Sequence, residues 1–181
     1  LESFSKTGQN FFLAVGMYRP HTPFVAPKKY FDMYDRKSIE IPYNGSTDKY
    51  LKTIPKIAVS SIRWKKDQIK LNLKSNKKLA QEIKEAYFAT TTFVDAQIGR
   101  ILKKLKQTGL DKNTIVVFIS DHGYHLGEHG HWQKQTLFDN STRVPLIFSG
   151  PGIESNVRIE NSPVELIDIY PTLMDLTGIE S

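Results

Sequence analysis

The sequence lacks cysteine altogether, which narrows the chemistry open to its 181 residues. Disulfide bridges, thiolate metal sites and a nucleophile derived from cysteine are all excluded from this segment. It also lacks an apolar run near the roughly 20 residues that a membrane-spanning helix needs, so we expect no membrane span. With 39% hydrophobic and 24% charged residues, the composition is typical of a soluble globular domain with a hydrophobic core.

Positive charge is distributed unevenly along the chain. The formal net charge is +6, and most of the excess lies between Lys49 and Lys78, where the basic residues face only Asp67. Two interpretations stay open: a solvated basic loop, or a surface that attracts an anionic substrate or polymer. No nucleic-acid-binding motif accompanies this stretch, and aromatic residues are not interleaved with it, so we do not expect nucleic acid as a partner.

Apolar runs alternate with helical patterns. The runs at Asn10–Gly16 (NFFLAVG), Thr114–Ser120 (TIVVFIS) and Val144–Phe148 predict buried strands. Apolar residues spaced by three and four predict a long amphipathic helix over Leu79–Thr108, ended by Gly109. This alternation predicts an α/β fold with a mainly parallel sheet.

Two shorter helices are also predicted. Pro27–Tyr34 is typical of a short helix with proline in its first turn. Near the end of the chain, Ser162–Glu165 resembles a capping box, but a helix that began there would carry Pro171 in its middle. A start at Asp168 places Pro171 in the first turn, where no backbone N–H is needed, and we prefer that start.

Four of the five histidines lie in one segment, Ser120–Lys134. Asp121 and His122 follow directly on a predicted strand, and Gly123 allows a sharp turn that lets adjacent side chains converge. Carboxylate and neutral imidazole both bind divalent cations, so the pair predicts a metal site. The alternative is a polar surface loop whose aspartate caps the next turn. The other histidines of the segment are expected to be structural, or to lie behind the metal ligands: His125, His129 and His131.

Two further side chains stand where they could act on an anion. Lys134 follows the histidine-rich segment and could supply a compact positive charge to a sulfuryl or phosphoryl group, or could simply be solvated. His21 lies between prolines at the end of the first predicted strand, in a position to protonate a leaving alkoxide. On the residues alone, both roles remain open.

Four segments in order resemble the type I, formylglycine-dependent sulfatases of the alkaline-phosphatase-like superfamily. They are FFLAVGMYRPHTPF, YFATTTFVDAQIGRIL, TIVVFISDHGYHLGEHGHWQKQTLFDNSTRVPLIFSGPG and VELIDIYPTLMDLTGI. The likeness is greatest to the iduronate-2-sulfatase-like and choline-sulfatase-like branch, because commoner arylsulfatases carry asparagine where this chain has His122. It covers nearly the whole chain except Lys49–Lys78, which is interpreted as part of a basic insertion at about residues 44–78.

The resemblance implies a role for each candidate. Asp121 and His122 match metal ligands, usually to calcium, while Lys134 matches the lysine on the sulfate and His21 the histidine at the leaving-group oxygen. It implies an alkaline-phosphatase-like sandwich, a sulfated carbohydrate or other sulfate ester as substrate, and a periplasmic or secreted location.

One departure from the family pattern stands out. The early aspartate pair and the Cys- or Ser-x-Pro-Ser-Arg motif, whose first residue becomes formylglycine, are both absent from this sequence. The chain is therefore interpreted as the C-terminal part of a sulfatase catalytic domain, with the N-terminal half as its missing partner, and is predicted to be inactive alone.

Three rival functions remain. A phosphonate monoester or phosphodiester hydrolase of the same superfamily shares the Asp-His-Gly motif and the formylglycine. A two-zinc phosphatase is less favoured, because it would need further ligands. A non-catalytic, basic anion-binding module is the alternative of another class, weakly supported by the basic stretch.

Overall fold

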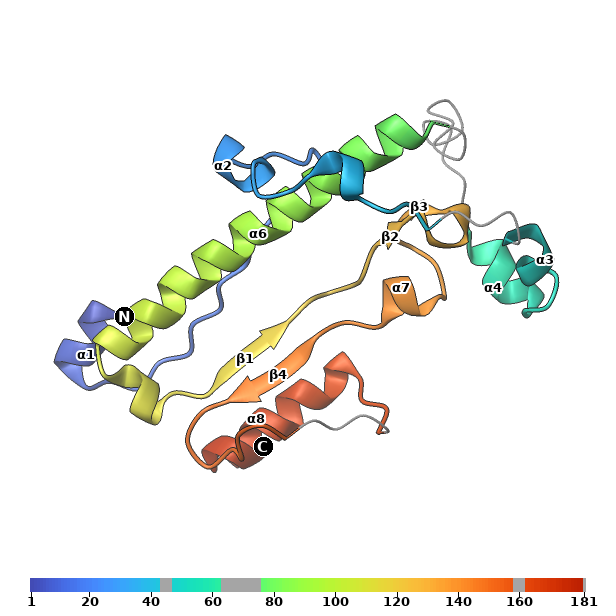
Figure 1. Cartoon of the computed structure of the whole chain (residues 1–181). Coiled ribbons are helices and arrows are strands. Elements are labelled where there is room, and N and C mark those ends of the chain that lie inside the picture. The colour runs from blue at the N-terminus through green and yellow to red at the C-terminus, as the bar shows by residue number, and fades with distance from the viewer. Residues whose placement is uncertain (43–46, 63–75, 158–161, 181) are drawn as a thin grey trace.

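The computed structural model describes residues 1–42, 47–62, 76–157 and 162–180. Its longest element is helix α6 (Lys77–Gln107), which runs the length of the molecule (Figure 1). The Asn76 side chain caps the helix start by accepting a hydrogen bond from the Leu79 N–H at 3.1 Å. Beyond the helix end, Gly109 adopts the left-handed conformation with φ 72°. These bounds confirm the predicted long helix to within two residues at its start.

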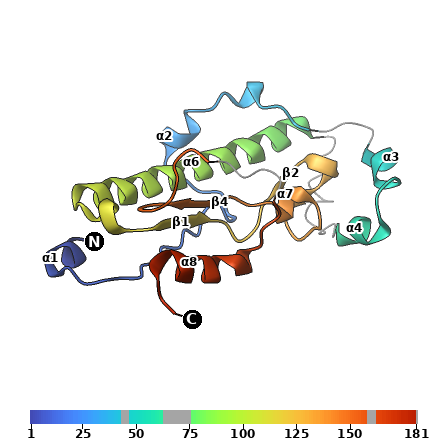
Figure 2. The ribbon, with the colours of Figure 1, turned by 90° about the horizontal axis from the view of Figure 1, so that it is seen from below.

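Strands β1 (Val116–Ile119) and β4 (Leu146–Ser149) confirm two of the predicted strands. They pair with each other, and Val116 lies opposite Ser149. Figures 1 and 2 show this pair between α6 on one side and α8 (Ile169–Thr177) on the other. The arrangement of helices on both faces of a sheet is the layering expected of an α/β fold.

Two expectations about the strands do not hold in this structure. Asn10–Gly16 is extended but belongs to neither strand pair, and its side chains are largely exposed, Phe12 to 87%. Both pairs in the described part of the chain, β1 with β4 and the short β2 (His125–Leu126) with β3 (Trp132–Gln133), are antiparallel rather than parallel. An apolar run specifies burial but neither the partner of a strand nor its direction, which depend on long-range contacts.

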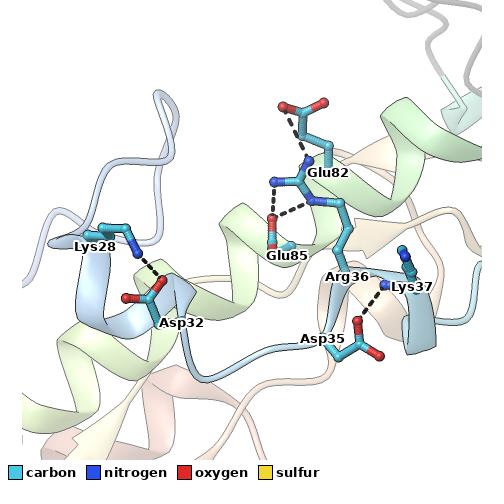
Figure 3. A network of polar contacts seen from close by, with 7 residues as sticks. All are labelled: Lys28, Asp32, Asp35, Arg36, Lys37, Glu82 and Glu85. Atoms are coloured by element: carbon cyan, nitrogen blue, oxygen red, sulfur yellow. Dashed lines mark hydrogen bonds and ion pairs between the residues drawn. The ribbon is translucent and has the colours of Figure 1, made fainter.

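A polar network fixes the segment before α6 onto that helix (Figure 3). Arg36, in the short helix η1 (Arg36–Ser38), donates to the buried carboxylate of Glu85 through Nε at 2.7 Å and pairs with it through Nη2 at 2.6 Å. A buried carboxylate is costly unless paired, so removal of Arg36 would leave an uncompensated charge. The Lys28–Asp32 pair of helix α2 (Lys28–Phe31) is exposed and contributes little.

The chain's last helix follows the preferred prediction. α8 (Ile169–Thr177) begins directly after Asp168, so Pro171 lies in its first turn, and Gly178 ends it at φ 65°. Asp168 accepts a hydrogen bond from the Glu165 N–H at 2.7 Å across the short helix η4 (Leu166–Asp168). The predicted short helix at residues 27–34 is present as α2, with Pro27 at its N-cap.

The remaining described helices are short. α1 (Glu2–Thr7) is tied to α6 by an ion pair between Glu2 and Lys104. α3 (Thr47–Leu51) and α4 (Lys56–Ser61) lie within the basic insertion, whose residues 43–46 and 63–75 are outside the described part of the chain. Among the helices described, none is long and apolar enough to cross a membrane, as the sequence predicted.

A small core links α6 to the histidine-rich segment. Ala80 of α6 packs with Leu126 and Trp132 of the β2–β3 hairpin. Tyr87 and Tyr124 are half-buried beside this cluster. The segment that carries the candidate metal ligands is thus held against the longest helix by apolar contacts.

Candidate functional site

The candidate metal ligands follow the end of β1, where the chain turns sharply at Gly123. A Cβ atom at this position would lie 2.2 Å from the Asn140 carbonyl oxygen, so only glycine fits. The Gly123 N–H donates to the Ser141 carbonyl at 2.8 Å. This close approach joins the turn to helix α7 (Asp139–Thr142) and fixes the backbone beside His122.

Asp121, His122 and Lys134 converge on one place. The His122 backbone N–H donates to Asp121 Oδ1 at 3.0 Å, and His122 Nε2 lies 3.4 Å from Asp121 Oδ2. Lys134 Nζ approaches the same His122 Nε2 at 2.6 Å, although twelve residues separate the two. The Asp121 side chain is 84% exposed, so its carboxylate is open to a ligand.

The hydrogen bonds of His122 determine its tautomer. His122 Nδ1 lies 2.8 Å from the Gly123 carbonyl oxygen, which can only accept, so Nδ1 carries the hydrogen. Nε2 then presents its lone pair towards Asp121 and Lys134. An imidazole that donates its other N–H to a backbone carbonyl is the usual arrangement of a metal-ligating histidine.

These donors fit part of a divalent cation site. A carboxylate and an imidazole lone pair on adjacent residues supply two ligands, and calcium takes six to eight, mostly oxygen. Within the residues that the structure describes, no cluster of three or more His, Cys, Asp or Glu side chains could hold a metal.

Lys134 is held by unusual backbone geometry. Its neighbours Gln133 and Gln135 have φ values of 129° and 69°, a region that favours glycine. Each such residue costs about 1–3 kcal/mol and persists only where surrounding contacts impose it, commonly at functional sites. The direction of the Lys134 side chain is therefore set by the fold and not by local preference.

His21 lies in a separate, exposed loop, and none of the hydrogen bonds found in the described residues joins it to Asp121, His122 or Lys134. Its Nδ1 donates to the Thr22 carbonyl at 2.8 Å, and its ring stands 5.1 Å from that of Tyr18. Nε2 is thus the atom that could carry a proton to a ligand. The structure thus orients the His21 ring, but the described residues show no direct contact between His21 and the other candidate residues.

Aromatic packing nevertheless connects the His21 loop to the metal-ligand turn. Phe24 meets Tyr87 of α6 edge-on at 5.6 Å and Tyr124 at 6.2 Å, and the two tyrosine rings stack at 5.2 Å. Burial raises the pKa of Tyr124 to about 12, so the phenol remains neutral and acts in packing. Three residues separate Phe24 from His21, and two separate Tyr124 from His122, so this trio limits how far the two loops can part.

The other three histidines form a cluster behind the turn. His125 and His131 are fully buried, with ring centroids 5.0 Å apart, and His129 stacks between Phe138 at 4.6 Å and Tyr50 of α3 at 5.0 Å. Burial, and then the proximity of His131, lower the pKa of His125 to about 4. The three rings are packed against one another and against Phe138 and Tyr50, as expected of structural histidines.

Sequence reasoning missed the residues that support the candidate ligands. Thr136 and Ser141 are buried polar side chains, and Tyr124 lies between two other aromatic rings. Nothing in the sequence distinguishes Thr136, two residues after Lys134, from a threonine on the surface. The contacts among Phe24, Tyr87 and Tyr124 could be predicted only if the contact between their loops were already known.

Comparisons with known proteins decide the family. The model of the family described as Sulfatase matches residues 1–179, nearly the whole chain. The chain belongs to the sulfatase family. This confirms the resemblance seen in the four sequence segments and, with it, the alkaline-phosphatase-like fold class.

Individual relatives agree with that family. A protein named sulfatase from Formosa agariphila is 40% identical over the whole chain, and iduronate 2-sulfatase from Homo sapiens is 32% identical over 99% of it. A solved structure of a phosphonate monoester hydrolase from Silicibacter pomeroyi superposes with a TM-score of 0.81 at 32% identity, over 98% of this chain.

The match extends over only part of each of those proteins. The chain spans 35% of the Formosa protein, 38% of human iduronate 2-sulfatase and 35% of the phosphonate hydrolase chain. The fold and family therefore follow directly from the comparisons, whereas the activity of a whole protein that contains this chain is a separate question.

Proposed function

We propose that this chain is the part of a sulfuric ester hydrolase that holds the cation, the sulfate and the leaving group. The observation that carries the proposal is the convergence of Asp121, His122 and Lys134 within hydrogen-bonding distance in a member of the sulfatase family. The nucleophile and the remaining metal ligands would lie in the rest of the catalytic domain, outside these 181 residues.

Asp121 and His122 would hold one divalent cation, which the family resemblance implies to be calcium. The cation would supply Lewis-acid polarisation of the sulfate oxygens, and the formylglycine of the family would supply the nucleophile. Asp121 contributes an exposed carboxylate, and His122 contributes the Nε2 lone pair that its Nδ1–H bond to Gly123 leaves open.

Lys134 would bind the sulfate. Its ammonium group lies 2.6 Å from His122 Nε2 and carries three hydrogens, so it could donate to an anion bound beside the proposed cation. A preorganised positive charge stabilises the charge that develops on the sulfate oxygens as the ester bond breaks. The positive φ values on both sides of Lys134 support this assignment, because the backbone there is imposed by the fold.

His21 would act as the general acid. The S–O bond to the alcohol would break with its electron pair on the departing oxygen as the sulfuryl group passes to the nucleophile, and a proton on His21 Nε2 would pass to that oxygen. The hydrogen bond from Nδ1 to the Thr22 carbonyl orients the ring for this transfer. An alcohol such as a sugar hydroxyl is a poor leaving group and depends on such a proton.

The basic insertion supports an anionic, extended substrate such as a sulfated carbohydrate. In its described part, Lys49, Lys52 and Lys56 are all exposed. The insertion is anchored to the histidine cluster by the stack of Tyr50 on His129 and by the Leu137 N–H, which donates to Ser61 Oγ at 3.1 Å. Its positive charge is thus held close to the segment that carries Lys134, where it would attract a polyanion.

A phosphonate monoester or phosphodiester hydrolase is the second candidate, favoured by the superposition on the Silicibacter pomeroyi enzyme. The test is to assay the full-length protein on an aryl sulfate, an aryl phosphonate monoester and an aryl phosphodiester that share one leaving group. We expect the largest kcat/KM on the sulfate. A larger value on the phosphonate would move the assignment to the second candidate, and metal-independent binding of sulfated glycan without turnover would indicate a non-catalytic module.

A further inference from the structure

A closed ring of contacts joins His122 and Lys134 through groups that the chemistry above does not use. Gly123, next to His122, donates its N–H to the Ser141 carbonyl at 2.8 Å. The Thr136 hydroxyl donates to Ser141 Oγ at 3.0 Å, and Thr136 lies two residues after Lys134. The contact of Lys134 Nζ with His122 Nε2 at 2.6 Å closes the ring.

His125 fixes this ring from behind. Its Nε2 lies 2.8 Å from Thr136 Oγ1. Because the Thr136 hydroxyl donates its hydrogen to Ser141, it must accept from His125, so His125 is the tautomer with its hydrogen on Nε2. The other nitrogen, Nδ1, is then a buried acceptor, and the described contacts provide no donor for it.

The inner hydrogen bonds of the ring are buried, so they restrict the positions of their residues more strongly than surface contacts would. His125, Thr136 and Ser141 are all buried side chains. In a poorly solvated interior a satisfied polar network rigidifies its surroundings, while a broken one leaves unpaired groups without water. The positions of the Gly123 and Thr136 backbones are therefore coupled to each other.

The strained backbone around Lys134 shows why such an anchor is needed. Gln133 and Gln135 both have positive φ. The Gln135 side chain is exposed, so burial of this side chain does not offset the cost of its backbone conformation. Thr136 is the first buried side chain after them, and its hydroxyl makes three hydrogen bonds, with His125, Ser141 and the Phe138 N–H. It is the point at which the conformation of the Lys134 segment is fixed.

We propose that His125 and Thr136 are positioning residues that hold Lys134 and His122 in the arrangement needed for the anion and the cation. The inference rests on the proposed function for what that arrangement does, but the ring itself is a property of this chain. Neither residue touches the substrate; each acts through the two side chains at the open end of the ring.

The test compares two buried threonines in the full-length protein. Thr136→Val removes the hydroxyl from the ring, and Thr136→Ser keeps it. Thr90→Val is the matched control, because Thr90 is also fully buried and bonded, at 2.9 and 2.8 Å, but only to the Ala86 and Tyr87 carbonyls of its own helix. For each variant kcat and KM on an aryl sulfate, calcium affinity by titration calorimetry, and the unfolding temperature are measured.

We expect Thr136→Val to lower kcat or calcium affinity by about 10–100-fold, the usual loss when a group behind a metal ligand is removed, with KM changed much less than kcat. Thr136→Ser should restore both, and Thr90→Val should lower the unfolding temperature without either effect. Should Thr136→Val not fold, Ser141→Ala removes only the hydroxyl that accepts from Thr136, and it should also lower kcat or calcium affinity.

Equal effects of Thr136→Val and Thr90→Val on kcat and calcium affinity would overturn the proposal, as would unchanged values in Ser141→Ala. The two ideas fail separately. If the wild-type protein hydrolyses no sulfate ester, the proposed function fails, whereas the calcium affinities of the threonine variants still decide whether the ring positions His122.

Discussion

The segment Asp121–Thr142 and the strand pair β1–β4 are built in opposite ways. In the first, the side chains of His125, Trp132 and Phe138 are buried within the chain's own contacts. In the second, Ile147 is 54% exposed, and on the neighbouring helix α8 Tyr170 is 66% exposed. The site segment thus carries its own core, while the sheet and α8 present apolar surface.

This difference separates contacts that the described residues make among themselves from apolar surface that they leave exposed. The turn at Gly123, the ring through Thr136 and the histidine cluster are fixed by contacts between described residues. The apolar faces of β4 and α8 have the character of surfaces that pack against further structure. We infer that contacts within this chain set the geometry at Lys134, and that the complete site also requires residues outside it.

The largest effect is expected when the chain is separated from the rest of the domain. Residues 1–181 expressed alone should show no turnover of an aryl sulfate with added calcium, because no cysteine, and no serine in a Ser-x-Pro-Ser-Arg motif, is present for conversion to the nucleophile. The exposed strand pair should also make this fragment prone to aggregation. Multiple turnover by the purified fragment would show that the active site is complete within these residues.

Lys134→Ala in the full-length protein should lower kcat by about 100–1,000-fold, because removal of one donor from a preorganised anion site typically lowers kcat by that factor. Stability should change little. Lys112→Ala is the matched control, because Lys112 is exposed in the short helix η2 (Leu110–Asn113). The measurement is steady-state kinetics on an aryl sulfate. Near-normal kcat in Lys134→Ala would mean that the lysine is only a neighbour of His122.

The sequence sufficed for elements that are decided locally. The α6 helix, the β1 and β4 strands and the start of α8 follow from apolar spacing, β-branched runs and the position of Pro171. The Asn10–Gly16 strand and the parallel direction could not be derived this way. Pairing partners are set by contacts between distant segments, and a continuous apolar run is compatible with several of them.

The same limit applies to the candidate site. Asp121 and His122 could be selected because they are adjacent and follow a strand, and Lys134 because it matched a family motif. Thr136 and Ser141 could not, because a hydrogen-bonded ring is defined by tertiary contacts and not by sequence spacing. The separate loop of His21 shows that a family match can name a residue without revealing how it is held.

His21→Ala should separate substrates by leaving group. On a sugar sulfate we expect a loss of about 100-fold or more, because general acid catalysis typically contributes that much, and on an activated aryl sulfate a far smaller loss. The ratio of kcat/KM on the two substrates is the readout. Equal losses on both substrates would indicate a structural histidine.

The smallest expected effect is that of acid, which should lower stability through the buried His125. The pKa of His125 is lowered to about 4, so the unfolded state binds a proton below about pH 6.5 that the folded state refuses. Stability should therefore fall as the pH drops from about 6.5 to about 4, by on the order of 2–3 kcal/mol. His131, His129 and Glu128 surround the ring and modify this shift.

The control for this prediction is His125→Gln, which keeps an N–H donor for Thr136 but cannot titrate. Denaturant unfolding of the two proteins at pH 7 and pH 4.5 isolates the contribution of His125 from that of the other acid-sensitive groups. The wild type should lose more stability than the variant over this interval. Identical losses would mean that His125 is not held neutral in the folded protein.

The central claim, that Asp121 and His122 bind a catalytic cation, is tested most directly by metal content. Elemental analysis of the full-length protein, with Asp121→Ala and the exposed-aspartate control Asp111→Ala, is the measurement. We predict one divalent cation per molecule, calcium, in the wild type and in Asp111→Ala, and its loss together with activity in Asp121→Ala. Stoichiometric metal retained in Asp121→Ala would contradict the account.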